Sequence, residues 1–170
     1  MFDRCEHGDH ARPEDDDGFI LYESRAICPY IAAKHPESGL IPTDPRANAL
    51  FEQAAAAELT NFDPSASKAG LELFRKSFGA PCDPAVVAEQ LEILDKKLDA
   101  YDAILSKQRY MAGDTFTLVD LFYLPYAPLV QLDESNIMTK KPNVARWYKK
   151  LVARPAWLAV NGGAETTTSY

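Results

Sequence analysis

Apolar residues recur along this sequence with the spacing of amphipathic helices. The clearest case follows Asp83-Pro84, where steps of three and four residues place six apolar side chains on one helical face: Val87, Leu91, Leu94, Leu98, Tyr101 and Leu105. The Asp-Pro pair itself supplies an N-cap followed by a proline at the first helical position. Asp44-Pro45 repeats that signal, and the pattern behind it predicts a helix that runs to about Thr60.

Two neighbouring segments carry the helical period together with a proline. Residues 25–34 predict a helix in which Pro29 should cause a kink or an early end, because proline removes a backbone hydrogen bond. Residues 61–64, which end in Asp-Pro, are expected to kink or end the helix that precedes them. Residues 65–78 then predict a further helix.

A capping box marks the start of the helix that we expect to be central. Thr117 and Asp120 stand three residues apart, so each side chain can bond the backbone N–H of the other. The sequence behind them is apolar nearly all round, which predicts a buried helix that continues through Pro128. Asp120 could also be read as a buried catalytic acid, but the capping box predicts a folding role. Residues 142–152 predict the last long helix, which Pro155 should stop.

The first part of the chain has a different pattern. Residues 1–17 are polar, acidic and without hydrophobic periodicity, which predicts disorder or loose attachment. Asp17-Gly18 is a turn signal, and Phe19–Tyr22 is a short apolar run that predicts a β-strand. The preceding residues make a poor strand, so the expected hairpin lacks its first half.

Composition and charge narrow the classes of function. The 170 residues carry a net charge of −7, which disfavours a nucleic-acid partner. The most apolar stretch, residues 116–132, is too short and too interrupted to span a membrane. The N-terminus is charged from its third residue and shows no signal peptide. Three widely spaced cysteines suggest reduced thiols in a cytoplasmic protein.

A group of potential metal ligands lies near the N-terminus, but we expect no metal site. Cys5, His7, Asp9 and His10 have a spacing that matches no common zinc motif, and chance clustering explains them better. Neighbouring carboxylates would also raise the pKa of the Cys5 thiol, so it is a poor candidate for a reactive group.

Three segments in this order resemble the glutathione transferase family, most closely the phi type of plants and fungi. They are residues 17–27 (DGFILYESRAI), residues 113–120 (GDTFTLVD) and residues 147–155. The resemblance covers about residues 15–160. It implies a mainly α protein, in which residues 43–170 form the all-helical C-terminal domain. Residues 1–42 would be a remnant, a short strand or hairpin plus a helix, of the thioredoxin-like α/β domain that binds glutathione.

The resemblance also implies site residues. Glu23 and Ser24 occupy the family's motif for the glutamyl end of glutathione. A helix N-terminus with a hydroxyl suits the carboxylate of that end, and a neighbouring carboxylate suits its ammonium. From the pattern alone, Ser24 would be only a cap and Glu23 only a first-turn acid. Arg25 would serve a homodimer interface, or be a plain exposed helix cation.

The family's electrophile cleft would lie against the helices that carry several aromatic residues. We expect Phe62, Phe122 and Tyr126, with Tyr123 beside them, to line this apolar pocket. The alternative for each of these residues is ordinary core packing. The expected partners are therefore glutathione, as co-substrate rather than cofactor, and a small apolar electrophile.

The chain departs from the family at the catalytic group. Members use a Ser, Tyr or Cys in the first strand-helix turn to stabilise the glutathione thiolate, and no Ser or Thr precedes Ser24 here. Where members have a proline in a cis peptide, this chain has Arg12, with Pro13 one residue out of register. No catalytic residue can be named.

Three hypotheses about function follow. The first is a glutathione transferase that conjugates glutathione to apolar electrophiles in detoxification, with weak or lost activity in this chain. The second is a non-catalytic binding or dimerisation module of the same superfamily. The third is a complete enzyme whose first segment lies outside an incorrect gene boundary.

Overall fold

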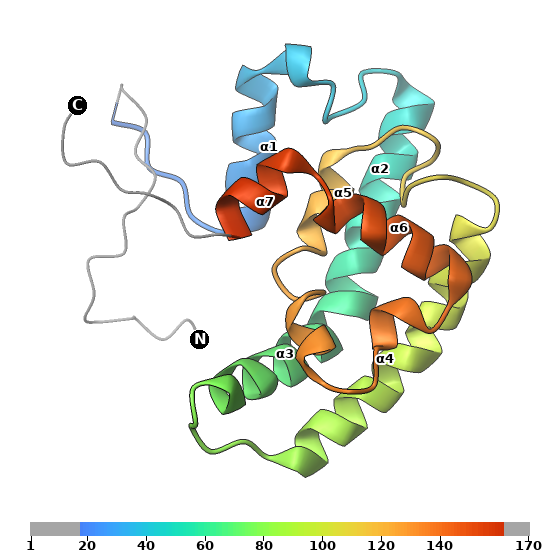
Figure 1. Cartoon of the computed structure of the whole chain (residues 1–170). Helices are drawn as coiled ribbons and strands as arrows, with labels where there is room; N and C mark the ends of the chain where they lie inside the picture. Colours follow the sequence, from blue (N-terminus) through green and yellow to red (C-terminus); the bar gives the residue numbers. More distant parts are fainter. Residues whose placement is uncertain (1–17, 162–170) are drawn as a thin grey trace.

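The computed structural model describes residues 18–161, and within this range the chain is helical with no β-strand. Figure 1 shows the helices packed around one another, with α5 near the middle of the view. The α-helices are α1 (Ser24–Lys34), α2 (Pro45–Ala57), α3 (Asp63–Ser77), α4 (Pro84–Leu105), α5 (Leu118–Phe122), α6 (Pro142–Val152) and α7 (Pro155–Asn161). Short turns of tighter or wider helix connect them: η1 (Pro36–Ser38), η2 (Glu58–Phe62), η3 (Leu129–Leu132) and η4 (Ile137–Thr139).

Helix α4 forms where the hydrophobic period predicted it. All six residues of the predicted face are buried. The Asp83 carboxylate caps the helix by accepting hydrogen bonds from the N–H groups of Ala85 and Val86 at 2.9 and 3.4 Å. Asp44 caps α2 in the same way, from the N–H groups of Arg46 and Ala47.

Helices α2 and α3 are joined without a loop by η2, a turn of π-helix. The sequence predicted a kink or an end at residues 61–64, and the wide turn lies across this point. Pro64 is the second residue of α3. A proline ring clashes with the carbonyl four residues earlier, so a wider turn relieves the crowding at Thr60.

Helix α5 is much shorter than predicted. It ends at Phe122, and the chain then turns until η3 begins at Leu129. Pro125 and Pro128 lack the N–H groups that a continuing helix needs, which explains the early end. The predicted burial of this segment is confirmed, since Leu118, Val119 and Asp120 are all inaccessible or nearly so.

Helix α6 confirms the predicted last long helix, but the sequence missed α7. Pro155 does end α6, as predicted. It also stands at the first position of α7, where its fixed backbone angle favours a helix start.

The strand predicted at Phe19–Tyr22 is wrong. Ile20 is a single bridge position, and no strand forms among residues 18–161. A strand needs a neighbour over several residues, and the side chains of Phe19, Ile20 and Tyr22 are exposed instead. In α1, Pro29 is tolerated and the helix continues to Lys34.

Several other predictions concern parts of the chain that the structure leaves open. The predicted disorder of residues 1–17 and the group of possible metal ligands around Cys5 lie outside the described residues. The proposed domain boundary after residue 42 falls in the loop between η1 and α2 and stays a prediction. Within residues 18–161, no helix is long and apolar enough to cross a membrane.

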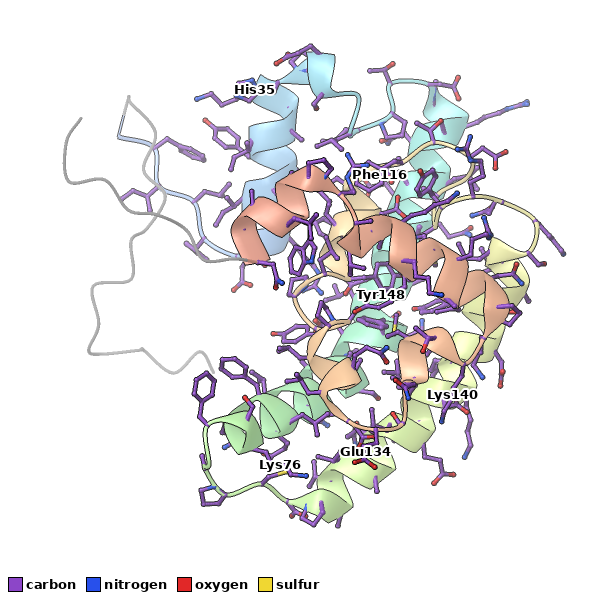
Figure 2. All side chains as sticks on the ribbon, in the orientation of Figure 1. His35, Lys76, Phe116, Glu134, Lys140 and Tyr148 are labelled. Carbon is purple, nitrogen blue, oxygen red and sulfur yellow. The ribbon has the colours of Figure 1, made fainter. Side chains whose placement is uncertain are left out.

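The core is built on large aromatic side chains. Trp147 of α6, Tyr123 and Phe62 have no accessible surface, and the ring centroids of Tyr123 lie 4.8 Å from those of both partners. Figure 2 shows side chains filling the space between α6 and the helices behind it. At Gly70 of α3 the packing is closest, because a Cβ there would lie 3.0 Å from the Cβ of Leu129.

Candidate functional site

The start of α1 has an unusual backbone. Glu23, the residue before the helix, has φ 70° and ψ 114°, a conformation that costs a non-glycine residue about 1–3 kcal/mol. The N–H groups of Ala26 and Ile27 donate to its carbonyl at 2.8 and 2.9 Å. Glu23 provides no side-chain cap, and both Glu23 and Ser24 are exposed. Strained backbone of this kind persists where its surroundings hold it, often at binding sites.

The first helical residues of α1 therefore present unused donors. Among residues 18–161, no acceptor takes a hydrogen bond from the backbone N–H of Ser24 or Arg25, or from the Ser24 hydroxyl. The helix dipole adds partial positive charge at the same point. Together these groups form a place where a carboxylate can bind, with the Glu23 carboxylate beside it.

Arg25 ties this end of α1 to the helical domain. Its guanidinium donates to both carboxylate oxygens of Glu58, at 2.9 and 2.8 Å, and to Asp63 at 2.9 Å. The guanidinium carbon also lies 5.9 Å from the centre of the Phe122 ring. The sequence alternative that Arg25 is a plain exposed cation is therefore wrong, because three other elements contact it.

The surroundings of the Arg25–Glu58 pair shift the pKa values of both residues. The Glu58 side chain has no accessible surface, and burial raises its pKa to about 7 although the hydrogen bonds from Arg25 oppose the rise. Burial alone would lower the pKa of Arg25, but its bonds to Asp63 and Glu58 outweigh that effect and raise it. Arg25 thus stays charged while Glu58 titrates near neutral pH.

The three aromatic residues predicted for the electrophile pocket have different surroundings in the structure. Phe62 is fully buried against Tyr123, so a ligand cannot reach it without displacing core side chains. Phe122 lines a cavity of about 320 Å³ together with Arg25 and Leu59. Tyr126 is half-buried in the turn that follows α5.

An apolar surface that the sequence analysis missed lies on α3. Leu71, Phe74 and Phe78 share one face of the helix and are all exposed, and the last two rings meet edge to face with centroids 4.9 Å apart. We call these three residues the α3 apolar stripe. Burial separates this face from the opposite one, where Leu73 lies with small residues that are buried: Ala66, Ala69 and Gly70.

The α3 apolar stripe lies on the same face of α3 as Asp63, which binds Arg25. Asp63, Ser67 and Leu71 follow in steps of four residues, so the stripe shares its face with the carboxylate that Arg25 binds. Figure 1 shows α3 and the start of α1 on the same side of the view, and Lys76 in Figure 2 marks the far end of α3.

The capping box at Thr117 and Asp120 is confirmed, with both of its reciprocal contacts present. The Asp120 carboxylate accepts from the Thr117 N–H at 3.0 Å, and it also accepts from the Met111 N–H at 3.1 Å and the Trp147 indole N–H at 2.8 Å. Burial raises the pKa of Asp120, against the effect of these bonds. The carboxylate is enclosed by donors from its own chain, which supports a folding role.

Other chemistry is sparse in the part of the chain that the structure describes. No cluster of three or more His, Cys, Asp or Glu side chains within residues 18–161 could hold a metal ion. Cys28 and Cys82 are free thiols that are half-buried, and burial raises the pKa of Cys28.

Comparison with known proteins identifies the class to which this fold belongs. Residues 62–155 match the model of the glutathione S-transferase C-terminal domain. Glutathione S-transferase PM239X14 of Arabidopsis thaliana is 42% identical over 139 residues, which are 79% of this chain and 64% of the relative. Glutathione S-transferase hmp2 of Hypomyces subiculosus is 41% identical over 88% of this chain and 74% of its own length.

Solved structures of glutathione transferases have the same fold as this chain. Glutathione transferase F2 from Populus trichocarpa superimposes with a TM-score of 0.81 at 33% identity, over 87% of this chain and 72% of the poplar protein. The chain belongs to the glutathione transferase family and is phi-like. It spans only about two thirds to three quarters of these relatives' lengths.

Proposed function

We propose that this chain binds glutathione by its glutamyl end at the start of α1. The glutamyl carboxylate would accept from the unused donors of Ser24 and Arg25, and the exposed Glu23 carboxylate would pair with the ammonium. The observation that carries the proposal is the strained backbone at Glu23, with φ 70°, directly before a helix end that lacks a side-chain cap. Strain held at one point of a helix is a common mark of a ligand site.

The electrophile would lie on the α3 apolar stripe. Arg25, the neighbour of Ser24, binds Asp63 of α3 at 2.9 Å, and the stripe is the exposed apolar surface of the same helix. Maize glutathione S-transferase I, whose TM-score is 0.78 at 29% identity over 88% of this chain and 70% of its own, was solved with an atrazine–glutathione conjugate. An aromatic electrophile of that kind suits the exposed rings of the stripe.

We propose further that conjugation is weak or absent in this chain. The reactive form of glutathione is the thiolate, and it needs a hydroxyl or thiol donor placed beside its sulfur. Among the 170 residues, the resemblance offers no Ser, Tyr or Cys at the position that does this in the family. Binding without activation of the sulfur is the expected behaviour.

Calorimetric titration with glutathione, together with turnover of chlorodinitrobenzene, tests both proposals. We expect measurable binding that Ser24→Ala weakens about tenfold, as the loss of a hydrogen bond to a charged group does. Ser106→Ala, a change of another exposed serine, is the matched control and should leave the affinity unchanged. A folded chain that gives no heat with glutathione would refute the binding site, and robust turnover would refute the lack of activation.

The alternative of a dimerisation module has an observation in its favour. Leu50 of α2 and Leu59 of η2 are exposed apolar side chains that border separate cavities, of about 280 and 320 Å³. We propose that the surface around Leu50 of α2 contributes to a homodimer. Light scattering should show a dimer that Leu50→Glu dissociates.

The free thiols of Cys28 and Cys82 support a reducing compartment, and we propose that the chain is located in the cytoplasm.

A further inference from the structure

Three elements of the helical domain converge on one side chain of α1. Glu58 of η2 holds the Arg25 guanidinium through both carboxylate oxygens, Asp63 of α3 holds it through a third bond, and the Phe122 ring lies beside it. Arg25 is the second residue of α1 and the neighbour of Ser24. The position of the first turn of α1 therefore depends on a residue that is distant in the sequence.

Of the two carboxylates, Glu58 is the one that can fix this geometry. Its side chain is completely inaccessible, whereas that of Asp63 is 22% accessible. Glu58 makes a paired, planar contact, which defines the orientation of a guanidinium as well as its place. It lies in a π-helical turn, the one departure from regular helix between α2 and α3, and such turns often lie at functional sites.

The strained backbone of Glu23 can persist only if the first turn of α1 is held in place. Its backbone conformation would relax if the first turn of α1 could move, because only surrounding contacts hold a strained residue in place. The bonds from Ala26 and Ile27 to the Glu23 carbonyl keep the turn itself intact. They do not attach it to the rest of the molecule, and Arg25 does.

We propose that Glu58 is a positioning residue for the glutathione site, which acts through Arg25 to hold the first turn of α1 with its free N–H groups turned to the ligand. This inference rests on the proposed glutathione site. Glu58 touches no ligand in this account. Its ionised form gives Arg25 a full charge partner, and its protonated form does not, so the affinity for glutathione should follow its ionisation.

Three other ionisable side chains lie near Glu58. Asp63 shares Arg25 with it, while Tyr101 of α4 and Tyr123 after α5 both sense its charge. Burial raises the pKa of Tyr101 to about 12 and that of Tyr123 well above its usual value. A change in affinity near neutral pH that depends on residue 58 therefore reports Glu58 itself.

Glu58→Gln and Glu52→Gln form a matched pair for the test. Glu52 lines the same cavity as Arg25 but makes no bond to it. Glutathione affinity is measured by calorimetry between pH 6 and 8 for the wild type and both variants. We expect the wild type and Glu52→Gln to bind more weakly as the pH falls through about 7, and Glu58→Gln to bind about tenfold more weakly than the wild type at pH 8 with a nearly flat profile.

Amide hydrogen exchange on the same proteins separates the failure of this inference from that of the proposed function. Faster exchange at Ala26 and Ile27 in Glu58→Gln, with α4 still protected, is the expected result even in the absence of ligand. If the wild type binds no glutathione, the proposed site is wrong. If it binds, but Glu58→Gln keeps the wild-type affinity and pH profile, or the first turn of α1 exchanges at the wild-type rate, the positioning role is overturned.

Discussion

Replacing Asp120 with alanine should be far more damaging than the loss of an ordinary helix cap. The sequence motif alone predicts a cost of about 1 kcal/mol. The structure shows a carboxylate with no accessible surface that accepts hydrogen bonds from three N–H groups, those of Met111, Thr117 and Trp147. Each buried donor left without an acceptor costs about 1–3 kcal/mol. Because the three share one cavity and can partly relax together, we expect a loss of about 4 kcal/mol in the free energy of unfolding.

Urea denaturation followed by fluorescence and circular dichroism measures this loss. Asp114→Ala is the control, since Asp114 also accepts a backbone N–H, from Arg109, but lies at the exposed surface. We expect the control to cost at most about 1 kcal/mol. A double-mutant cycle with Trp147→Phe should show coupling, because that change removes one of the three donors. If Asp120→Ala costs no more than Asp114→Ala, the inference that the carboxylate organises the core is refuted.

Three further predictions concern packing, pH and helix capping. Gly70→Ala should lower the free energy of unfolding by about 1–3 kcal/mol in urea denaturation, because its Cβ would lie 3.0 Å from Leu129, while Lys68→Gly, at an exposed position of the same helix, tests helix propensity. The pKa of Glu58 is raised to about 7 in the folded chain, so the folded state binds more protons than the unfolded state below that pH. The free energy of unfolding of the wild type, relative to that of Glu58→Gln, should therefore rise as the pH falls from about 7 to 5. A difference that stays constant over this range would contradict the prediction. Asp102→Ala should cost about 1 kcal/mol, since Asp102 of α4 caps α6 by accepting from the N–H groups of Asn143 and Val144 at 2.8 and 3.2 Å, and Glu92→Ala, which removes an exposed ion pair within α4, is its control.

The sequence predicted those parts of the fold that local chemistry determines. The Asp-Pro pairs before α2 and α4, the buried face of α4 and the Thr117–Asp120 capping box all appear as expected. In each case the signal and the structure that it specifies lie within one helix. Backbone caps and helical periodicity act over a few residues, so a single sequence is enough to recognise them.

The parts that failed depend on contacts between distant residues. Phe19–Tyr22 has strand-forming residues, but a strand needs partners that local sequence does not reveal. The pair of Arg25 with Glu58 joins residues 33 positions apart, and the sequence treated each one separately. At the candidate site, the motif Glu23-Ser24 pointed to the start of α1. Its aromatic counterpart on α3 became visible only once burial distinguished Leu73 from Phe74.

The pKa of the glutathione thiol in the presence of excess chain tests the central claim most directly, namely that the chain holds the peptide without activating its sulfur. Titration of the thiolate absorbance gives this value. We predict a pKa near that of a free thiol, about 8.5, and the same value for the Ser24→Ala variant. A bound thiol whose pKa falls to about 7 or lower would show that the chain supplies a stabilising group for the thiolate, and would contradict the account.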